Sequence, residues 1–254
     1  MPLLQVQGLA KSYRQMEGGS TRAIDEISFD VGRGEFVSLV GPSGCGKTTL
    51  LMCVAGLNTP DSGKVMVNDE AINGPPRNLV LIFQDYNKSL FAWRSVLGNV
   101  LFGLEGRGRV SAGAQERARQ LIELVGLAGF ERHYPCELSG GMQQRVAIAR
   151  ALAYEPEILL MDEPFGSVDA LTRLELEDTL LAIWKDVGTT ILLVTHDIEE
   201  ALYLSDRIYV LSRRPSRITQ SLGVTLGRPR NQLTTRADAK FMELRNEIYK
   251  QISR

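Results

Sequence analysis

The sequence is short of cysteine, of net charge and of long apolar runs, and each shortage excludes a class of protein. Among 254 residues there are 3 cysteines and 2 histidines, and 29 Lys and Arg nearly balance 30 Asp and Glu. So few and scattered cysteines cannot form a disulfide framework, and none has metal-ligand spacing with a histidine. A net charge of −1 gives no sign of a nucleic-acid partner.

The chain also lacks the marks of a membrane-spanning or secreted protein. No stretch approaches the roughly 18 unbroken apolar residues that a spanning helix needs. Met1 to Val6 has neither a basic start nor a long apolar run, so we expect no secretory signal. With 44% apolar residues, the sequence predicts one globular unit over residues 1–254, kept in the cytosol and linked to a membrane only through a partner.

Charge is unevenly distributed near the C-terminus. From Arg213 to Arg254 there are ten Lys or Arg residues against three Asp or Glu. Two interpretations are open: a segment that contacts anionic lipid head groups, or a solvated face, which is favoured. The segment is too short for a regulatory domain, so we expect no built-in sensor of a small molecule.

Hydrophobic periodicity divides the chain into three regions. Alternation predicts strands from Leu4 to Leu9 and from Ile24 to Val31, joined by a polar, glycine-rich turn over residues 15–22. Residues 85–150 show helical spacing, with one apolar face in a helix around 118–125. Beyond them, strands and helices alternate over five ranges: 158–161, 171–187, 190–195, 198–204 and 208–212.

This order of elements predicts an α/β fold. The alternating strands and helices favour a mainly parallel sheet flanked by helices. An antiparallel β subdomain precedes it, and an α-helical subdomain of about residues 85–150 is inserted into it. About residues 213–254 form a short C-terminal extension, whose last helix is amphipathic with apolar residues at Phe241, Leu244, Ile248 and Ile252.

A phosphate-binding loop stands at the start of the α/β region. Residues 41–48 fit the eight-residue phosphate-loop pattern without substitution, between a strand at 35–40 and a helix at 48–55. Such a loop wraps a phosphate with backbone N–H groups, Lys47 adds positive charge, and the Thr48 hydroxyl ligates Mg²⁺. The predicted nucleotide contacts are Gly41, Pro42, Ser43, Gly44, Cys45, Gly46, Lys47, Thr48 and Thr49.

Cys45 occupies a position that the phosphate-loop pattern leaves free. Either the helix start lowers the pKa of its thiol and makes it reactive, or it is a small filler, which is the favoured interpretation. In both cases a thiol reagent attached to it would block the nucleotide by its bulk.

Two carboxylates follow a second apolar strand. Asp162 comes at the end of strand 158–161, where a carboxylate lies near the phosphate loop and can hold Mg²⁺. Glu163 is next, and strand alternation aims it elsewhere, where it can act as a general base toward an attacking water. A structural salt bridge is disfavoured for Glu163, because unpaired charge on a buried strand is costly.

Two further polar residues follow predicted strands. His196 comes after strand 190–195, at the sheet edge where ligands collect in open α/β folds. A lone histidine is more often structural, but this position favours a ligand contact. Gln84 follows strand 79–83, and its amide can ligate Mg²⁺ or a water bound to it.

Residues 138–145, Leu-Ser-Gly-Gly-Met-Gln-Gln-Arg, narrow the interpretation to one family. Together with the phosphate loop and the Asp162–Glu163 pair, they make the chain resemble the ATP-binding cassette (ABC) ATPases, whose signature is Leu-Ser-Gly-Gly-Gln or a close variant. The resemblance implies a P-loop NTPase core that hydrolyses ATP with Mg²⁺. It implies three catalytic residues: Lys47, the carboxylate Glu163 and the switch histidine His196, which contacts the γ-phosphate.

The resemblance also assigns two residues at the edge of the site. It implies that Tyr13 stacks on adenine, for which the alternative is an aromatic residue at a strand end. It implies that Gln84 lies on a movable loop linking the nucleotide to a membrane partner.

The signature residues open a helix, and the N–H groups of Ser139, Gly140 and Gly141 make a second anion site. The resemblance implies a head-to-tail dimer with a second copy or a related chain, because one chain cannot easily use both anion sites on one ATP. Residues 166–169 resemble the D-loop that crosses this interface and ends at Asp169, with Val168 in place of the usual leucine.

Residues 90–96 place Phe91 and Trp93 in a loop. They either pack locally in the core or, as the resemblance implies and as we favour, line a groove that receives a coupling helix of a membrane permease.

Across essentially its whole length the chain resembles the nitrate, sulfonate and taurine importer ATPases, on residues 91–96, 161–166 and 211–218, with Ala92 in place of a common proline. The resemblance implies a peripheral ATPase at the cytoplasmic face of the inner membrane, served indirectly by an extracytoplasmic solute-binding protein. Cargo of the riboflavin or pyrimidine type stays open. A soluble cassette ATPase acting on DNA or the ribosome is disfavoured by the single motif set and the lack of coiled-coil heptads.

Overall fold

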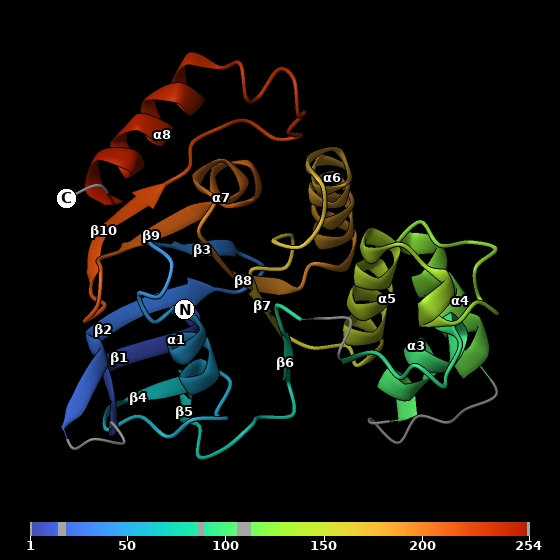
Figure 1. The fold of residues 1–254 in the computed structure, drawn as a ribbon, viewed down its shortest axis with the longest axis horizontal. Helices are drawn as coiled ribbons and strands as arrows, with labels where there is room; N and C mark the ends of the chain where they lie inside the picture. The colour runs from blue at the N-terminus through green and yellow to red at the C-terminus, as the bar shows by residue number, and fades with distance from the viewer. Residues whose placement is uncertain (1, 15–18, 86–88, 106–112, 253–254) are drawn as a thin grey trace.

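The computed structural model describes residues 2–14, 19–85, 89–105 and 113–252. Figure 1 shows two β-sheets on one side of the molecule and a group of short helices on the other, with longer helices between and above them. The larger sheet carries the predicted phosphate loop, after β3, and the Asp162–Glu163 pair, at the end of β7.

The larger sheet has six strands in the order β10–β9–β3–β8–β7–β6. Neighbours from β9 to β6 pair in parallel, and the edge strand β10 pairs antiparallel with β9. The mainly parallel sheet is therefore confirmed, with β10 as an unpredicted addition. The bounds are β3 Phe36–Val40, β6 Leu79–Ile82, β7 Ile158–Asp162, β8 Thr190–Thr195, β9 Arg207–Leu211 and β10 Ile218–Gly223.

The helices either pack on the sheets or gather beyond β6 (Figure 1). Those packed on the sheets are α1 (Lys47–Val54), α6 (Ala170–Val187), α7 (Ile198–Leu204) and α8 (Ala239–Ile252). The inserted segment contains α3 (Val96–Glu105), α4 (Ala114–Leu124), the 3-10 helix η1 (Pro135–Glu137) and α5 (Gly140–Ala153).

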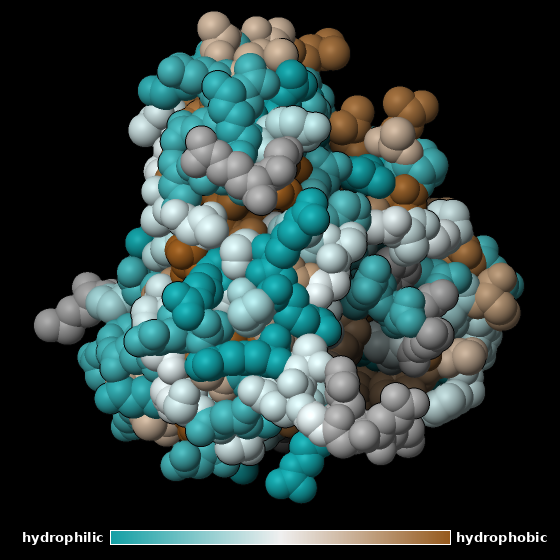
Figure 2. Space-filling model, turned by 60° about the vertical axis from the view of Figure 1, so that its left-hand side comes forward, coloured by the Kyte–Doolittle hydropathy of each residue, from teal (hydrophilic) through white to brown (hydrophobic). Residues whose placement is uncertain are grey.

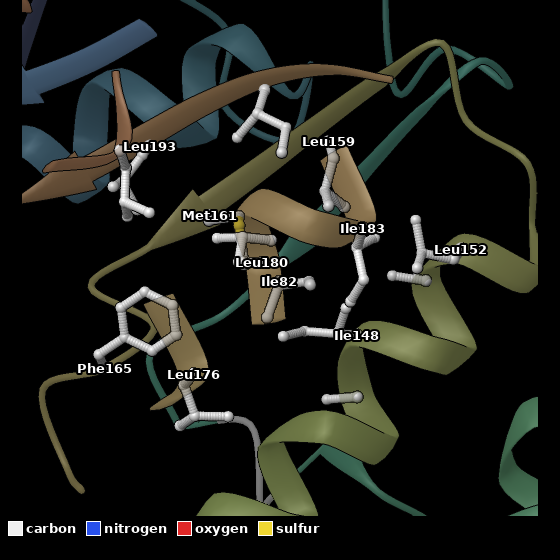
Figure 3. Close-up of a cluster of buried hydrophobic side chains, with 14 of the residues drawn as sticks. Ile82, Ile148, Leu152, Leu159, Met161, Phe165, Leu176, Leu180, Ile183 and Leu193 are labelled. Carbon is white, nitrogen blue, oxygen red and sulfur yellow. The ribbon is translucent and has the colours of Figure 1, made fainter. Parts of the chain in front are cut away.

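Both faces of the larger sheet are buried, because alternate side chains of its strands enter two different cores. On β7, Ile158 and Leu160 join the core that includes α1 and the smaller sheet. Leu159 and Met161 join the core beneath α5 and α6, as Figure 3 shows. The unbroken apolar run of β7 is what burial on both faces requires, and it leaves only the strand end for polar residues.

The smaller sheet is antiparallel, with the order β2–β1–β4–β5. Its strands are β1 Pro2–Arg14, β2 Ser20–Gly32, β4 Ser62–Val67 and β5 Glu70–Ala71. The turn predicted over residues 15–22 is wrong for Ser20 to Arg22, which belong to β2, while residues 15–18 lie outside the described residues. Polar residues are tolerated here because an antiparallel pair can face water on one side, and Tyr13 pairs with Thr21.

Five arginines of the C-terminal extension bind groups on the body of the protein. Their partners are Asp25 for Arg217, Asp206 for Arg228, the carbonyl groups at the end of α7 for Arg230, and Glu199 for both Arg236 and Arg245. Neither a lipid-binding segment nor a solvated face describes Arg230 and Arg236, which are largely buried, whereas Arg217 remains solvated with 63% of its side chain exposed. The extension is instead tied to the sheet and to α7.

The surface is mixed in character. On the face shown in Figure 2, hydrophilic residues predominate and hydrophobic residues form separate patches. Within the described part of the chain, no helix combines the length and the apolar content that crossing a bilayer requires.

Candidate functional site

The phosphate loop lies between the end of β3 and the start of α1, in the predicted strand–loop–helix context. Gly46 has a φ of 118°, in the left-handed region, and a Cβ on it would lie 3.0 Å from the carbonyl oxygen of Ala23. A larger residue would strain this turn, so glycine is required where the loop enters the helix. The loop is buried at Gly41, Cys45 and Gly46, half-buried at Pro42 and exposed at Ser43 and Gly44.

Lys47 stands at the centre of the site although only 5% of it is exposed. Its ammonium group donates to the carbonyl oxygens of Gly41 at 2.9 Å and Pro42 at 3.0 Å, and lies 3.3 Å from Glu163 Oε1. Because a buried ammonium without acceptors is costly, these three oxygens hold the charge of Lys47 at the loop.

Glu163 lies between Lys47 and His196. Its Oε1 faces Lys47, and its Oε2 accepts a hydrogen bond from His196 Nδ1 at 2.9 Å. Strand alternation does not aim this side chain, because β7 ends at Asp162 and Glu163 has a φ of 43°. A left-handed conformation is costly for a residue other than glycine and is typical of functional sites. The turn, and not the strand, brings the carboxylate between its two basic partners.

Asp162 is a buried carboxylate with capacity for another ligand. Only 3% of it is exposed, and its Oδ1 has no hydrogen-bond partner among the residues described. Burial raises the pKa of Asp162 above its ordinary value, and the Thr48 hydroxyl, which donates to the carboxylate, opposes that effect. Mg²⁺ prefers oxygen ligands, so Thr48 and Asp162 fit the predicted ion.

Gln84 lies beside the turn that follows β7. It is exposed, two residues beyond the end of β6. Its Nε2 atom lies 4.0 Å from where a Cβ would stand on Gly166, whose N–H donates to the carbonyl oxygen of Glu163 at 3.1 Å. The structure thus brings the predicted third metal-site residue to the same strand ends as Glu163.

Tyr13 approaches the phosphate loop from the smaller sheet. Its hydroxyl donates to Thr49 Oγ1 at 3.4 Å and accepts a hydrogen bond from Asn58 at 3.2 Å. The Lys11 ammonium lies 5.9 Å from the ring centroid. The partly exposed ring therefore stands beside the first turn of α1, within the predicted nucleotide site.

Cys45 behaves as a filler. Its side chain is buried in the core shared by α1 and the two sheets, and a Cβ on Gly41 would lie 3.2 Å from its sulfur. This agrees with the favoured interpretation, and the sulfur helps to explain why residue 41 is glycine.

The signature residues open α5, as predicted. Ser139 caps the helix by accepting a hydrogen bond from the Met142 N–H at 3.3 Å, and Gly140 and Gly141 form its first turn. A Cβ on Gly141 would lie 2.5 Å from Thr172 Cγ2, so the close approach of α5 to α6 requires a glycine there. Figure 1 shows α5 and α1 in separate parts of the molecule, so a single chain keeps the signature and the phosphate loop apart.

Asp169 caps α6 by accepting a hydrogen bond from the Thr172 N–H at 3.0 Å. Hydrogen bonds from Thr172 hold the pKa of Asp169 below its ordinary value. Val168, the unusual residue of this loop, packs against the main core. The loop is thus anchored at both residues and its carboxylate stays at the surface.

Phe91 and Trp93 belong to an aromatic cluster, with their ring centroids 5.2 Å apart. Phe91 also packs edge-on against Phe102 and lines a hollow of about 350 Å³ with Phe83, Phe102 and Tyr154. Trp93 is 75% exposed. Phe91 thus both packs locally and lines this hollow, whereas Trp93 is presented to solvent, so both interpretations of the loop stay open.

A network around His196 was not predicted. Asp197 caps α7 by accepting hydrogen bonds from the N–H groups of Glu199 at 2.9 Å and Glu200 at 3.2 Å. Arg173 of α6 binds the other oxygen of Asp197 at 3.0 Å. The cap could have been recognised in the sequence, because an aspartate precedes an acidic first turn. Arg173, the basic partner of Asp197, lies 24 residues away in the chain, and no sequence signal points to it.

Comparison with known proteins places this geometry in a family. The family model described as ABC transporter matches residues 24–166. An uncharacterized ABC transporter ATP-binding protein of Methanocaldococcus jannaschii is 47% identical over 245 residues, covering 96% of this chain and 89% of the relative. A taurine import ATP-binding protein of Yersinia pestis is 43% identical over 225 residues, covering 89% and 86%. An aliphatic sulfonates import ATP-binding protein of Bacillus thuringiensis is 41% identical over 239 residues, covering 94% and 92%.

Solved structures agree with this result. The dimeric structure of the bacterial ABC transporter cassette MJ0796 matches with a TM-score of 0.76 and 32% identity, covering 87% of this chain and 98% of that chain. The same cassette in a post-hydrolysis state bound to ADP and Pi also matches with a TM-score of 0.76, at 31% identity. The predicted P-loop NTPase fold is confirmed.

Proposed function

Since the chain belongs to the ABC transporter family and is an ATPase coupled to transport, we propose that it is the motor subunit of an importer. Two copies, or this chain and a related one, close head to tail on two ATP molecules and reopen after hydrolysis. The observation that carries the proposal is the cluster of Lys47, Glu163 and His196, in which one carboxylate contacts both basic side chains.

Hydrolysis depends on these three residues. Lys47 and the N–H groups of its loop bind the phosphates, and Tyr13 stacks on the adenine. Glu163 accepts the proton of the attacking water at its carboxylate, a role that contributes about 10²–10⁴-fold to rate. His196 contacts the γ-phosphate, and its hydrogen bond to Glu163 Oε2 fixes the orientation of both groups.

Thr48, Asp162 and Gln84 would hold Mg²⁺. Their oxygen atoms match what this ion prefers, and the unpartnered Oδ1 of Asp162 supports the assignment. When bound, Mg²⁺ neutralises charge on the β- and γ-phosphates.

The second half of each ATP site comes from the partner chain. Ser139, Gly140 and Gly141 present N–H groups at the start of α5, which suits an anion. Asp169 lies on the loop that crosses the interface. The separation of α5 from α1 in Figure 1 supports this arrangement, because it leaves each half-site to be completed by another chain.

The membrane partner is a separate permease that docks beside Phe91 and Trp93. The exposed Trp93 and the hollow lined by Phe91 supply an aromatic anchor and a recess for a coupling helix. The chain acts as a peripheral subunit at the cytoplasmic face of the inner membrane. An extracytoplasmic solute-binding protein delivers cargo to the permease. The taurine and sulfonate import relatives favour a small, often anionic cargo such as nitrate, a sulfonate or taurine.

The decisive experiment compares Glu163→Gln with the wild type and with Glu123→Gln, a control on the exposed face of α4. We expect Glu163→Gln to bind ATP and to dimerise at saturating ATP, while hydrolysis falls by about 10²–10⁴-fold. A variant that stays monomeric under these conditions would contradict the shared-site arrangement.

The same variants test transport. In a strain lacking this chain, uptake of labelled nitrate, taurine, an alkanesulfonate and bicarbonate is measured. Loss of one uptake, restored by the wild type and by Glu123→Gln but not by Glu163→Gln, identifies the cargo class. Unchanged uptake of all four would contradict the proposed cargo and leave the ATPase role standing.

A further inference from the structure

The C-terminal extension holds the helix that begins directly after His196. That helix, α7, carries Glu199 in its first turn. Arg236 Nη1 lies 2.9 Å from Glu199 Oε2, and Arg245 Nη1 lies 3.0 Å from Glu199 Oε1. Both oxygens of one carboxylate are therefore bound by arginines of the extension. Thr195, at the end of β8, accepts a hydrogen bond from the Asp197 N–H at 3.0 Å. This bond links the residues directly before and after His196.

Arg236 also reaches α6, the helix that follows Asp169. Its Nη2 lies 2.8 Å from Glu177 Oε2, and Glu177 is buried. Its Nε donates to Gln232 at 2.8 Å, so all three nitrogens of the guanidinium are bound. One arginine from the extension thus bridges the helix after the D-loop and the helix after His196.

The last helix also lies at the site itself. His196, Asp197, Ile198 and Glu199 line one wall of a pocket of about 630 Å³, and Arg245, Asn246 and Tyr249 of α8 line another. In Figure 1, α7 lies between α8 and the larger sheet. Residues of α8 therefore share this pocket with His196 and the first turn of α7.

We propose that Arg236 and Arg245 are positioning residues for ATP hydrolysis, which hold His196 against Glu163 by fixing Glu199 and the first turn of α7. The inference rests on the role of His196 given under the proposed function. The Arg245–Glu199 pair is partly exposed, with side chains 35% and 42% accessible, so it contributes little to stability. The pair is expected to affect kcat more than stability, because a small misplacement of a catalytic group lowers the reaction rate strongly.

The proposal is tested with Glu199→Gln, Arg245→Gln and the double variant, beside Lys250→Gln as a control on α8. Removing Glu199 leaves no buried charge unpaired, because Arg236 keeps Glu177 as its partner. We expect kcat to fall about tenfold in each variant, with no further fall in the double variant, while the Kd for ATP stays within about twofold. Arg245→Lys should recover much of the lost kcat, and Lys250→Gln should match the wild type.

His196→Ala is measured in parallel to separate the two ideas. If His196→Ala loses hydrolysis while Glu199→Gln keeps the kcat of the wild type, the positioning role is refuted and the proposed function stands. If the kcat and the melting temperature of Glu199→Gln fall together while its Kd for ATP rises, the contact is merely structural and the proposal is overturned. If His196→Ala hydrolyses ATP normally, the catalytic role given to His196 in the proposed function is refuted. The positioning role of Arg236 and Arg245 then loses its basis as well.

Discussion

Asp162→Asn is expected to stabilise the protein while abolishing its hydrolytic activity. The carboxylate is buried, one of its oxygens lacks a partner among the described residues, and burial raises its pKa. A buried polar atom without a partner costs about 1–3 kcal/mol, and more when the group that carries it is charged. The attraction of Lys47 offsets part of this cost. Replacing the charge with an amide of the same shape should therefore gain about 1 kcal/mol, which corresponds to roughly 2–4 °C in Tm for a chain of this size.

The assay is thermal unfolding without nucleotide or Mg²⁺, then with ATP and Mg²⁺. Without ligands, Asp162→Asn should melt above the wild type, whereas Asp186→Asn, an exposed control on α6, should shift stability by less than about 0.5 kcal/mol. With ATP and Mg²⁺ the order of the two melting temperatures should reverse, because only the wild type keeps all the ligands of the proposed metal site. A lower Tm for Asp162→Asn without ligands would refute the argument that this carboxylate is strained by burial.

Two further predictions concern the core beside the site. Burial, together with the charges of Glu177 and Asp197, raises the pKa of Glu200. The stability that its retained proton contributes is present below the ordinary carboxyl pKa of 4.5 and is lost as pH rises from there through the raised pKa, so the Tm advantage of Glu200→Gln over the wild type should widen as pH rises above 4.5. Gly141→Ala should cost about 1–3 kcal/mol in urea unfolding, because the added Cβ would lie 2.5 Å from Thr172 Cγ2. Thr172→Ser, which removes that methyl group, should restore much of the loss; no rescue would contradict the packing argument.

The parallel strands could be predicted from sequence because their signals are local. β7 and β8 are short apolar runs that end in polar residues, and both were expected within one residue of their bounds. β10 could not be predicted, since none of its residues is fully buried and its strand character comes from pairing with β9.

The same distinction between local and long-range signals applies to the residues of the site. Lys47, Asp162 and Glu163 could be located because each stands in a motif whose chemistry depends on its neighbours in the chain. The contact between Glu163 and His196 joins residues 33 apart, and those of Glu199 with Arg236 and Arg245 join residues 37 and 46 apart. These pairs depend on which strand ends lie together in the fold and on where the C-terminal extension packs. The sequence therefore indicated that the basic extension is a surface feature, whereas most of its arginines bind other parts of the protein.

The order of strands in the larger sheet has a consequence for synthesis on the ribosome. β3 is made early, yet both of its neighbours come late: Phe36 pairs with Ile191, 155 residues further on (191 − 36), and Val37 pairs with Arg207. At about 5–20 residues per second, β3 waits roughly 8–30 s for β8 to be translated. Every residue of β3 ends up buried. A nascent chain that stalls before β8 therefore carries an unpaired apolar strand, and its survival depends on chaperones more than on its own stability.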